Sequence, residues 1–340
     1  MRKLLLSISA MAAIYGAASF AGGEVNIYTL REPALLQPIL DSFTEATGID
    51  VNATWVQDGI LARLEAEGDK SPADAVLTVD ISRLSEIANA GMFVNVDNEN
   101  IIAKVDEHLR QPNGQWFGLT KRARVIIASK DRVSAEDMPK TYEELADAKW
   151  KGKVCTRSGK HVYNIGVISS MIAAHGEEDT KAWVQALKDN RGRKPSGNDR
   201  AQARAVYEGV CDIALINSYY LGEMAMNDEE PEQKDWYNAV NVIFPNQEDR
   251  GAHINISGMG ILKNGQNQEN AEKLLEYLLS DEAQQAYAAL NFEFPVVENV
   301  AVDPLVASWG EFKEEQTSLQ EIADNAPIAS QIVDEVRFDF

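Results

Sequence analysis

Residues 211–222 of the chain read CDIALINSYYLG, an apolar run that ends in two adjacent tyrosines. The uncharged residues 213–216 predict a buried parallel strand, and the asparagine and serine at 217–218 are residue types that end a strand and cap a helix. We therefore expect Tyr219 and Tyr220 in the first turn of a helix. Neighbouring side chains there diverge by only about 100°, so both phenols can face one point. That point lies beyond the carboxyl end of a strand, where open α/β sheets bind ligands.

Tyr163 has the same position in a second predicted unit. A strand at 153–156 leads into a loop at 157–161, and a helix begins near 162–164. The alternative for the adjacent pair Tyr219 and Tyr220 is that they are amphipathic residues at the edge of the core, with their hydroxyls in water.

Strands and helices alternate along the rest of the chain. Strands are predicted at 25–28, 51–56 and 75–79, with amphipathic helices between them, and a second set of strands begins near Lys151. This alternation predicts an α/β fold built on doubly wound sheets. The chain has 340 residues, which is long for one core and suits two domains.

A strand-like run at 116–127 has an unusually polar centre. Lys121, Arg122 and Arg124 place three cations within four residues of it. Such a centre suits a segment that crosses between two domains with its charges toward a cleft. The alternative is an exposed edge strand whose charges are solvated.

The N-terminus has the pattern of a signal peptide. Arg2 and Lys3 precede a largely apolar stretch at 4–14, and the small residues Ser19 and Ala21 suit a cleavage site after Ala21. No other stretch approaches the ~18 uncharged apolar residues of a membrane span. We expect export to a bacterial periplasm.

The net charge bears on the class of binding partner, and the cysteines bear on a disulfide. The formal net charge of −21 argues against nucleic acid and is typical of a solvated surface. The two cysteines, Cys155 and Cys211, each adjoin a predicted strand and would reach an oxidising compartment. A disulfide can form if those strands are neighbours; separately buried thiols are the alternative.

Catalytic motifs are absent from the sequence. The four histidines form no H-E-x-x-H pair, and there is no G-x-S-x-G elbow, no P-loop and no dinucleotide-binding glycine pattern after the first strand. We expect a binding protein rather than an enzyme. An extracytoplasmic hydrolase is the remote alternative.

The three tyrosines favour a hard metal ion. A phenol has an unperturbed pKa of about 10 and loses its proton near neutral pH only to a strong cation. Ferric ion is the obvious candidate, because three phenolates would balance its charge and leave positions for a small anion. Arg31, Arg122 and Arg124 are suited to hold that anion through bidentate hydrogen bonds.

The sequence resembles the periplasmic ferric-ion-binding proteins that serve bacterial ABC transporters, over essentially the whole mature chain. The resemblance is carried by segments in a fixed order: 71–74 (SPAD), 78–80 (TVD), 116–124 (WFGLTKRAR), 155–159 (CTRSG), 163–164 (YN), 217–220 (NSYY), 244–247 (FPNQ) and 253–258 (HINISG).

The resemblance implies a site and a fold. Tyr163, Tyr219 and Tyr220 are the expected ferric ligands, and Arg31 and Arg122 the residues that hold a synergistic carbonate or bicarbonate. The expected fold is a type II solute-binding clamp with two crossing strands as its hinge. The expected partner is an ABC permease in the inner membrane, and the protein is expected to be a monomer.

The domains of such a clamp are discontinuous. We expect a first domain of 22–122 plus 247–297. The second, with the tyrosines, is expected to comprise 123–246 plus 298–340. The chain would cross between them near Arg122 and near residues 245–246.

The chain departs from one branch of that family. A His-Tyr pair that donates ligands there is replaced by Glu32 and Pro33, and proline cannot ligate. The pattern is closer to the branch that uses three tyrosines plus carbonate. Glu32, Tyr28 and Arg124 are less favoured members of the site. Another solute of the thiamine, polyamine or phosphate type is the alternative cargo, and citrate is an alternative to carbonate.

Overall fold

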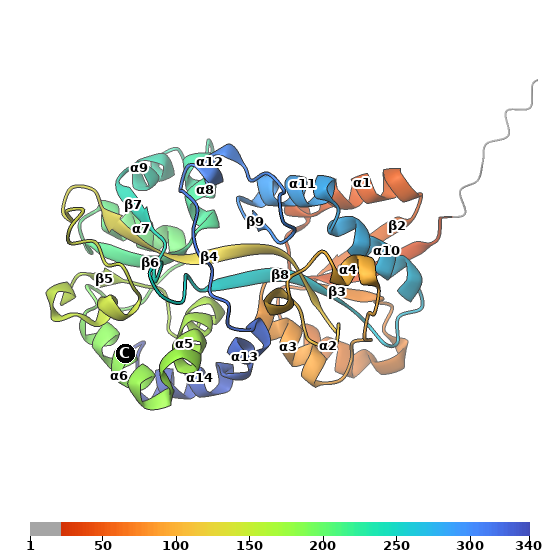
Figure 1. The fold of residues 1–340 in the computed structure, drawn as a ribbon, viewed down its shortest axis with the longest axis horizontal. Helices are drawn as coiled ribbons and strands as arrows, with labels where there is room; N and C mark the ends of the chain where they lie inside the picture. Colours follow the sequence, from red (N-terminus) through yellow and green to blue (C-terminus); the bar gives the residue numbers. More distant parts are fainter. Residues whose placement is uncertain (1–21) are drawn as a thin grey trace, which may run out of the picture.

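The structure is a computed structural model that describes residues 22–340 and has two lobes joined by long strands (Figure 1). The predicted signal peptide, residues 1–21, lies outside the described residues. In the described part of the chain, no helix is both long enough and apolar enough to cross a membrane.

The first lobe is built on a mixed sheet. Its strand β1 (Glu24–Thr29) is parallel to β2 (Asp50–Trp55) and to β3 (Ala75–Thr78), and β3 is antiparallel to β8 (Ile254–Ile261). The helices of this lobe are α1 (Gln37–Thr47), α2 (Ile60–Glu67), α3 (Ile81–Asn89), α4 (Glu99–Ile102), α10 (Gln268–Leu278) and α11 (Asp281–Asn291).

Local sequence explains where these helices start and stop. The carboxylate of Asp80 accepts a hydrogen bond from the backbone N–H of Ser82 at 2.9 Å and caps α3. Gly48, with φ of 71°, ends α1 in the left-handed conformation that glycine adopts without strain.

The second lobe contains the tyrosine strand. This strand, β6 (Ile213–Asn217), is parallel to β5 (Val154–Cys155), and β7 (Val240–Ile243) lies in the same sheet. The helices are α5 (Val162–His175), α6 (Glu177–Asp189), α7 (Asp199–Tyr207), α8 (Tyr219–Ala225), α9 (Glu232–Asn238), α12 (Pro304–Ala307), α13 (Leu319–Asp324) and α14 (Ala326–Glu335).

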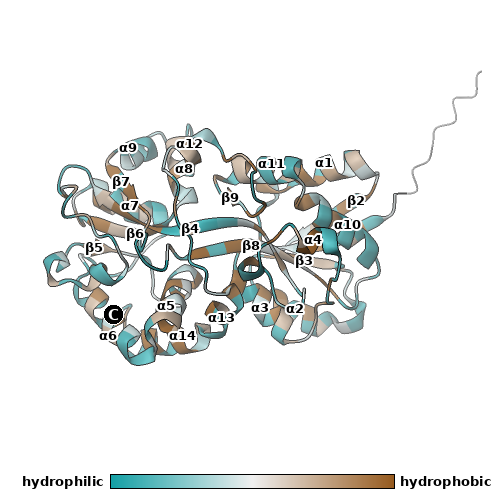
Figure 2. Ribbon diagram, viewed as in Figure 1, coloured by the Kyte–Doolittle hydropathy of each residue, from teal (hydrophilic) through white to brown (hydrophobic). Residues whose placement is uncertain are grey.

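Strand β4 (Phe117–Ser129) belongs to both sheets. Its residues 117–123 pair with β8, its residues 124–128 pair with β6, and the short β9 (Phe294–Pro295) pairs with Thr120 and Lys121. Figure 2 shows the middle of β4 as hydrophilic where it passes between the lobes. Arg122 and Arg124 are nevertheless only 1% and 2% exposed. The alternative of an exposed edge strand is therefore wrong.

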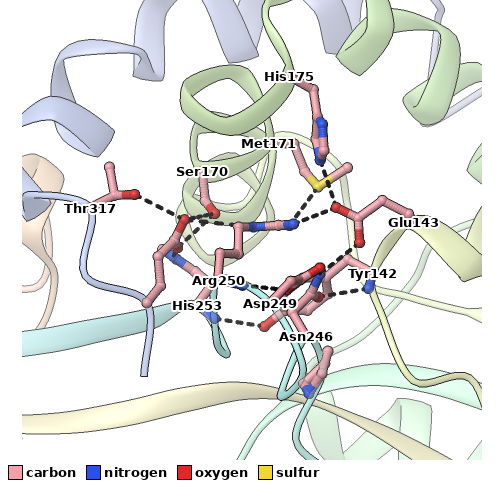
Figure 3. Close-up of polar contacts among 12 residues, drawn as sticks. Tyr142, Glu143, Ser170, Met171, His175, Asn246, Asp249, Arg250, His253 and Thr317 are labelled. Atoms are coloured by element: carbon pink, nitrogen blue, oxygen red, sulfur yellow. Dashed lines mark hydrogen bonds and ion pairs between the residues drawn. The ribbon is translucent and has the colours of Figure 1, made fainter. Parts of the chain in front are cut away.

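The chain passes between the sheets a second time at residues 244–253, between β7 and β8. Figure 3 shows how side chains tie this segment to the second lobe. The Asn246 amide oxygen accepts a hydrogen bond from the backbone N–H of Tyr142 at 3.0 Å, and the Tyr142 hydroxyl accepts one from the backbone N–H of His253 at 3.0 Å. Arg250 forms an ion pair with Glu143. Specific contacts thus hold this second connection between the sheets on the second lobe.

Separate hydrophobic cores fill the two lobes. The core of the first lobe draws residues from 25–119 and 254–297, as well as Leu319 and Ile322 of α13. The predicted division assigns α13 to the second domain. Its side chains Leu319 and Ile322 nevertheless pack in the core of the first lobe, across the predicted domain boundary. The cores of the second lobe draw on β4 after Arg122, on β5, β6 and on α14. The exact division into two domains stays a prediction.

The two cysteines form a disulfide. Cys155 ends β5 and Cys211 lies two residues before the neighbouring strand β6, with their Cα atoms 5.7 Å apart. The sequence left open the choice between a disulfide and separately buried thiols. The pairing of β5 with β6 decides it, because it brings the two cysteines together. The bond fixes the start of the tyrosine strand against β5, and we expect it to stabilise the fold by restricting the unfolded chain.

Candidate metal centre

The pair Tyr219 and Tyr220 is positioned by a buried strand and the turn that follows it. All five residues of β6 are buried, and α8 begins at Tyr219, as the sequence predicts. The hydroxyl of Ser218 accepts a hydrogen bond from the backbone N–H of Ala123 at 3.2 Å, which fixes the turn on β4. The two phenol rings stack with centroids 4.2 Å apart and planes at 28°.

Tyr163 reaches the same place from another helix. It lies in the first turn of α5, where its backbone N–H donates a hydrogen bond of 3.2 Å to Nδ1 of His161. Its hydroxyl oxygen is 3.4 Å from that of Tyr219. The carboxyl ends of β5 and β6 therefore deliver their tyrosines to one point.

One cavity of about 290 Å³ collects the predicted residues. Tyr163, Tyr219 and Tyr220 line it on the side of the second lobe, and Arg31 and Arg122 line it as well. The other lining residues are Leu30, Glu32, Leu35, Val79, Arg200, Glu223 and Glu293. Three phenols and three guanidinium groups, those of Arg31, Arg122 and Arg200, thus share one space of small-ligand size.

Arg31 and Arg122 flank a buried carboxylate that sequence analysis missed. Arg31 Nη2 donates to both oxygens of Glu293, at 3.0 and 3.1 Å, and Arg122 Nη1 is 3.9 Å from Glu293 Oε1. Glu293 is 1% exposed and also accepts a hydrogen bond from the Thr120 hydroxyl. The sequence contains one signal for Glu293, because this acidic residue lies between Phe292 and Phe294 within an apolar run.

Arg31 has less free hydrogen-bonding capacity than Arg122. Besides Glu293, its guanidinium donates to Asn291 Oδ1 at 2.8 Å and to the hydroxyl of Ser257. Arg122 donates to the carbonyl oxygen of Val79 and, at 3.4 Å, to Ser257. Nε of each arginine is buried without a partner. Arg122 is the stronger candidate for binding an anion.

Arg124, the alternative anion residue, is occupied elsewhere. Its guanidinium pairs with Asp199 at 2.5 Å and donates to the side-chain oxygens of Asn217 and Asn164 at 3.0 and 2.9 Å. It does not line the 290 Å³ cavity. The Arg124–Asp199 pair therefore holds β4, β6 and the starts of α5 and α7 together.

Glu32 and Tyr28 also differ in position. Glu32 is exposed and lines the cavity. Tyr28 is buried, and its hydroxyl donates to the Glu67 carboxylate, with distances of 2.9 and 2.8 Å to the two oxygens. Tyr28 is not among the cavity residues, which fits the packing role favoured for it.

Glu223 and Arg200 form a second charged pair in the cavity wall. Glu223 lies one helical turn after Tyr219 on α8 and forms an ion pair with Arg200 of α7. The Arg200 guanidinium carbon lies 5.2 Å from the centroid of the Tyr220 ring. The spacing from Tyr219 to Glu223 was the sequence signal for this residue, because side chains four apart share a helix face.

Burial and crowding of acidic groups shift the pKa values in the cavity. Burial, followed by the nearby Tyr163, raises the pKa of Tyr219 well above its usual value and that of Tyr220 to about 12. Burial also raises the pKa of Glu223 to about 7, against the lowering effect of Arg200. Burial lowers the pKa of Arg31, but the Glu293 carboxylate more than reverses this, so Arg31 stays charged.

The donor set is unusual for a metal site. Within residues 22–340, no three or more histidine, cysteine, aspartate or glutamate side chains gather in a way that could hold a metal ion. The cavity offers three phenol oxygens, which are hard donors once deprotonated, beside the carboxylates of Glu32, Glu223 and Glu293. Such donors suit a hard trivalent ion and exclude the usual zinc arrangements.

Comparison with known proteins places the chain among transport proteins. Residues 70–314 match the family described as bacterial extracellular solute-binding protein. The chain is 44% identical over 313 residues to iron uptake protein A1 of a Synechocystis strain, which covers 92% of this chain and 86% of the relative.

Solved structures share the whole fold. Ferric iron-binding protein A of Mannheimia haemolytica, in an open conformation, is 45% identical with a TM-score of 0.89, and the match covers 94% of this chain and 99% of that one. A Trichodesmium protein in complex with iron and citrate ligands is 40% identical with a TM-score of 0.89, covering 92% and 99%. The predicted fold class is confirmed.

Proposed function

The chain belongs to the family of bacterial extracellular solute-binding proteins, and we propose that it binds ferric ion for uptake through Tyr163, Tyr219 and Tyr220. The observation that carries the proposal is the convergence of these three tyrosines in one cavity, with the Tyr163 and Tyr219 hydroxyls 3.4 Å apart. Phenolate oxygens at that spacing can ligate the same ion. The names of the iron-uptake and ferric-binding relatives support this choice of solute.

The family assignment also defines the kind of protein. It is a solute-binding transport protein and not an enzyme. We propose that it works in the periplasm as a monomer and passes its ferric ion to an ABC permease in the inner membrane. The family's extracellular location and the predicted signal peptide support this proposal.

A small anion completes the proposed site. Arg122 supplies most of the free donors, and Arg31 the rest, for carbonate or bicarbonate bound beside the metal. Such an anion would fill coordination positions that three tyrosines leave open. Citrate is the second candidate, because the Trichodesmium relative was solved with iron and citrate ligands.

A ferric titration followed by visible absorbance tests the metal ligands. Phenolate-to-iron charge transfer should colour the wild-type protein in the presence of bicarbonate. Tyr163→Phe, Tyr219→Phe and Tyr220→Phe each remove one donor and keep the ring. We expect each variant to lose more than about 100-fold in ferric affinity, beyond the 10–100-fold typical of changes outside the ligand set.

Tyr28→Phe is the matched control, because this buried phenol binds Glu67 outside the cavity. It should bind ferric ion as the wild type does, with all variants checked for folding by circular dichroism. Unchanged affinity in the three ligand variants would contradict the assignment. Loss confined to Glu32→Gln would move the metal to the first lobe, and a colourless wild type would favour another solute.

A further inference from the structure

The loop at residues 157–161, which precedes Tyr163, is held by a carboxylate from far along the chain. Asp339 Oδ2 accepts a hydrogen bond from the Ser158 hydroxyl at 2.6 Å, and Asp339 Oδ1 accepts one from the backbone N–H of Gly159 at 2.8 Å. Ser158 and Asp339 are 181 positions apart. One half-buried side chain therefore ties two consecutive residues of this loop, through the stronger kind of hydrogen bond that an ionised acceptor makes.

The same loop positions the start of α5. The Ser158 carbonyl oxygen accepts hydrogen bonds from the backbone N–H of His161 and from Asn164 Nδ2, both at 3.1 Å. His161 Nδ1 in turn accepts one from the backbone N–H of Tyr163 at 3.2 Å. A continuous series of hydrogen bonds therefore runs from Asp339 to the backbone of Tyr163.

Packing holds Asp339 itself in place. It follows α14, which shares a hydrophobic core with α5. The neighbouring Phe338 is buried and lies against Gly159, because a Cβ atom at position 159 would be only 2.7 Å from Phe338 Cδ1. The Phe338 carbonyl oxygen also accepts a hydrogen bond from the Arg191 guanidinium. The Asp339 carboxylate thus belongs to a rigid part of the second lobe.

We propose, on the basis of the ferric function proposed above, that Asp339 is a positioning residue for the metal ligand Tyr163. It holds the loop so that the Tyr163 hydroxyl stays 3.4 Å from that of Tyr219 before ferric ion binds. Donors that are already in place lose less conformational entropy on binding than mobile ones do. Tyr219 follows β6 and is held by a different turn, so its position should not depend on Asp339.

A double-mutant cycle tests this assignment, because residues that act through one another have non-additive effects. Asp339→Ala should lower the ferric affinity about 10- to 100-fold, as is typical of changes just outside a ligand set. It should have the same effect in Tyr219→Phe, which keeps Tyr163, and no further effect in Tyr163→Phe. Asp339→Asn keeps one acceptor oxygen, so its affinity should lie between those of Asp339→Ala and wild type. Competition with a chelator of known affinity measures each variant.

Asp334→Ala is the matched control. Asp334 also binds this loop, through an ion pair with Lys160, but both side chains are exposed. An exposed pair contributes little, so the ferric affinity of this variant should stay within about twofold of wild type.

Hydrogen exchange of the metal-free protein tests the same link without iron. In Asp339→Ala the backbone amides of Gly159 and Tyr163 should exchange faster than in wild type or Asp334→Ala. The amide of Leu221, which binds the Ser218 carbonyl oxygen beyond β6, should exchange as before.

Two outcomes would overturn the proposal. One is unchanged exchange at Tyr163 in folded Asp339→Ala, and the other is that the affinity losses of Asp339→Ala and Tyr163→Phe simply add. A wild type that binds no ferric ion would refute the ferric function, and with it the ligand role of Tyr163. The exchange data would still decide whether Asp339 holds this turn.

Discussion

At the scale of single residues, Tyr219 and Tyr220 keep their protons in the metal-free protein. Burial and the nearby phenol of Tyr163 raise the pKa of Tyr219 and bring that of Tyr220 to about 12. Ferric ion must displace these protons to bind. Metal binding therefore releases protons, and acid opposes it.

The first prediction is a steep loss of ferric affinity in acid. Two or three displaced protons should lower the affinity by about 100- to 1000-fold for each unit of pH below neutral, because each proton contributes about tenfold. Competition with a chelator of known affinity, at several pH values between 6 and 8, measures the slope. Affinity that stays flat from neutral pH to about 4 would exclude a phenolate site.

Arg122 and Arg124 are residues of one type whose surroundings give them different positions relative to the cavity. Arg122 and Arg124 lie two apart on β4, so their side chains leave the same face of the strand. Arg122 nevertheless lines the cavity, whereas Arg124 is enclosed by Asp199, Asn164 and Asn217. A buried pair of this kind is costly to break, because the Asp199 carboxylate would lose its shorter ion pair and keep only the longer one to Arg157, at 3.4 Å.

At the scale of elements, residues 244–253 are held on the second lobe by a cluster of polar side chains (Figure 3). Glu143 lies at one end of it. Its carboxylate accepts hydrogen bonds from Asn246 at 2.8 Å and from Arg250, and it lies 2.7 Å from Nε2 of His175. Burial acts to raise the pKa of Glu143, but Asn246, Arg250 and His175 outweigh it and lower that pKa to about 2.

The second prediction follows from the sign of this shift. Because the pKa of Glu143 is about 2 when folded and 4.5 when unperturbed, its contribution to stability is complete above pH 4.5. It is lost as the pH falls toward 2. Since Glu143 is about one-third exposed, we expect a loss of about 1–2 kcal/mol over that range.

Urea unfolding at pH 5, 4 and 3 measures this contribution. Glu143→Gln should be less stable than wild type at pH 5, and the difference should shrink as the pH falls. Glu136→Gln, at an exposed position, is the control and should follow wild type throughout. A constant difference between Glu143→Gln and wild type across this range would contradict the prediction.

At the scale of the whole molecule, the two lobes meet where the tyrosine helix passes the first lobe. Gly222 of α8 packs against Phe292, the residue next to Glu293. A Cβ atom at position 222 would lie 2.2 to 2.6 Å from Cγ, Cβ and Cδ1 of Phe292, closer than atoms can approach. The glycine therefore permits the contact between the lobes that brings α8 to the arginines.

The third prediction is that Gly222→Ala holds the lobes apart. Alanine favours the helix by up to about 1 kcal/mol, so α8 itself should not unfold. The added methyl group should increase the radius of gyration in X-ray scattering and weaken ferric binding. Combining it with Phe292→Gly should restore both properties, because Phe292 has φ of 52°, a conformation that glycine adopts freely. Wild-type scattering and affinity in Gly222→Ala would refute this role.

Much of the architecture follows from the sequence by itself. Apolar runs and helix caps predicted the strand that ends at Asn217, the helices that begin at Val162 and Tyr219, and the α/β class. The doubly wound rule then brought Tyr163, Tyr219 and Tyr220 to one edge. These inferences succeeded because hydrophobic period and capping are local properties of the chain.

Only the tertiary structure decided which charges meet in the cavity. Arg31 and Glu293 are 262 positions apart, and their pairing depends on β9 lying against β4. The same holds for the disulfide between Cys155 and Cys211, and for the burial that separates Arg122 from Arg124. Local patterns specify strands and helices, but a buried charge takes whichever partner the packed lobes bring within a few ångströms. The identity of that partner is therefore a property of the fold.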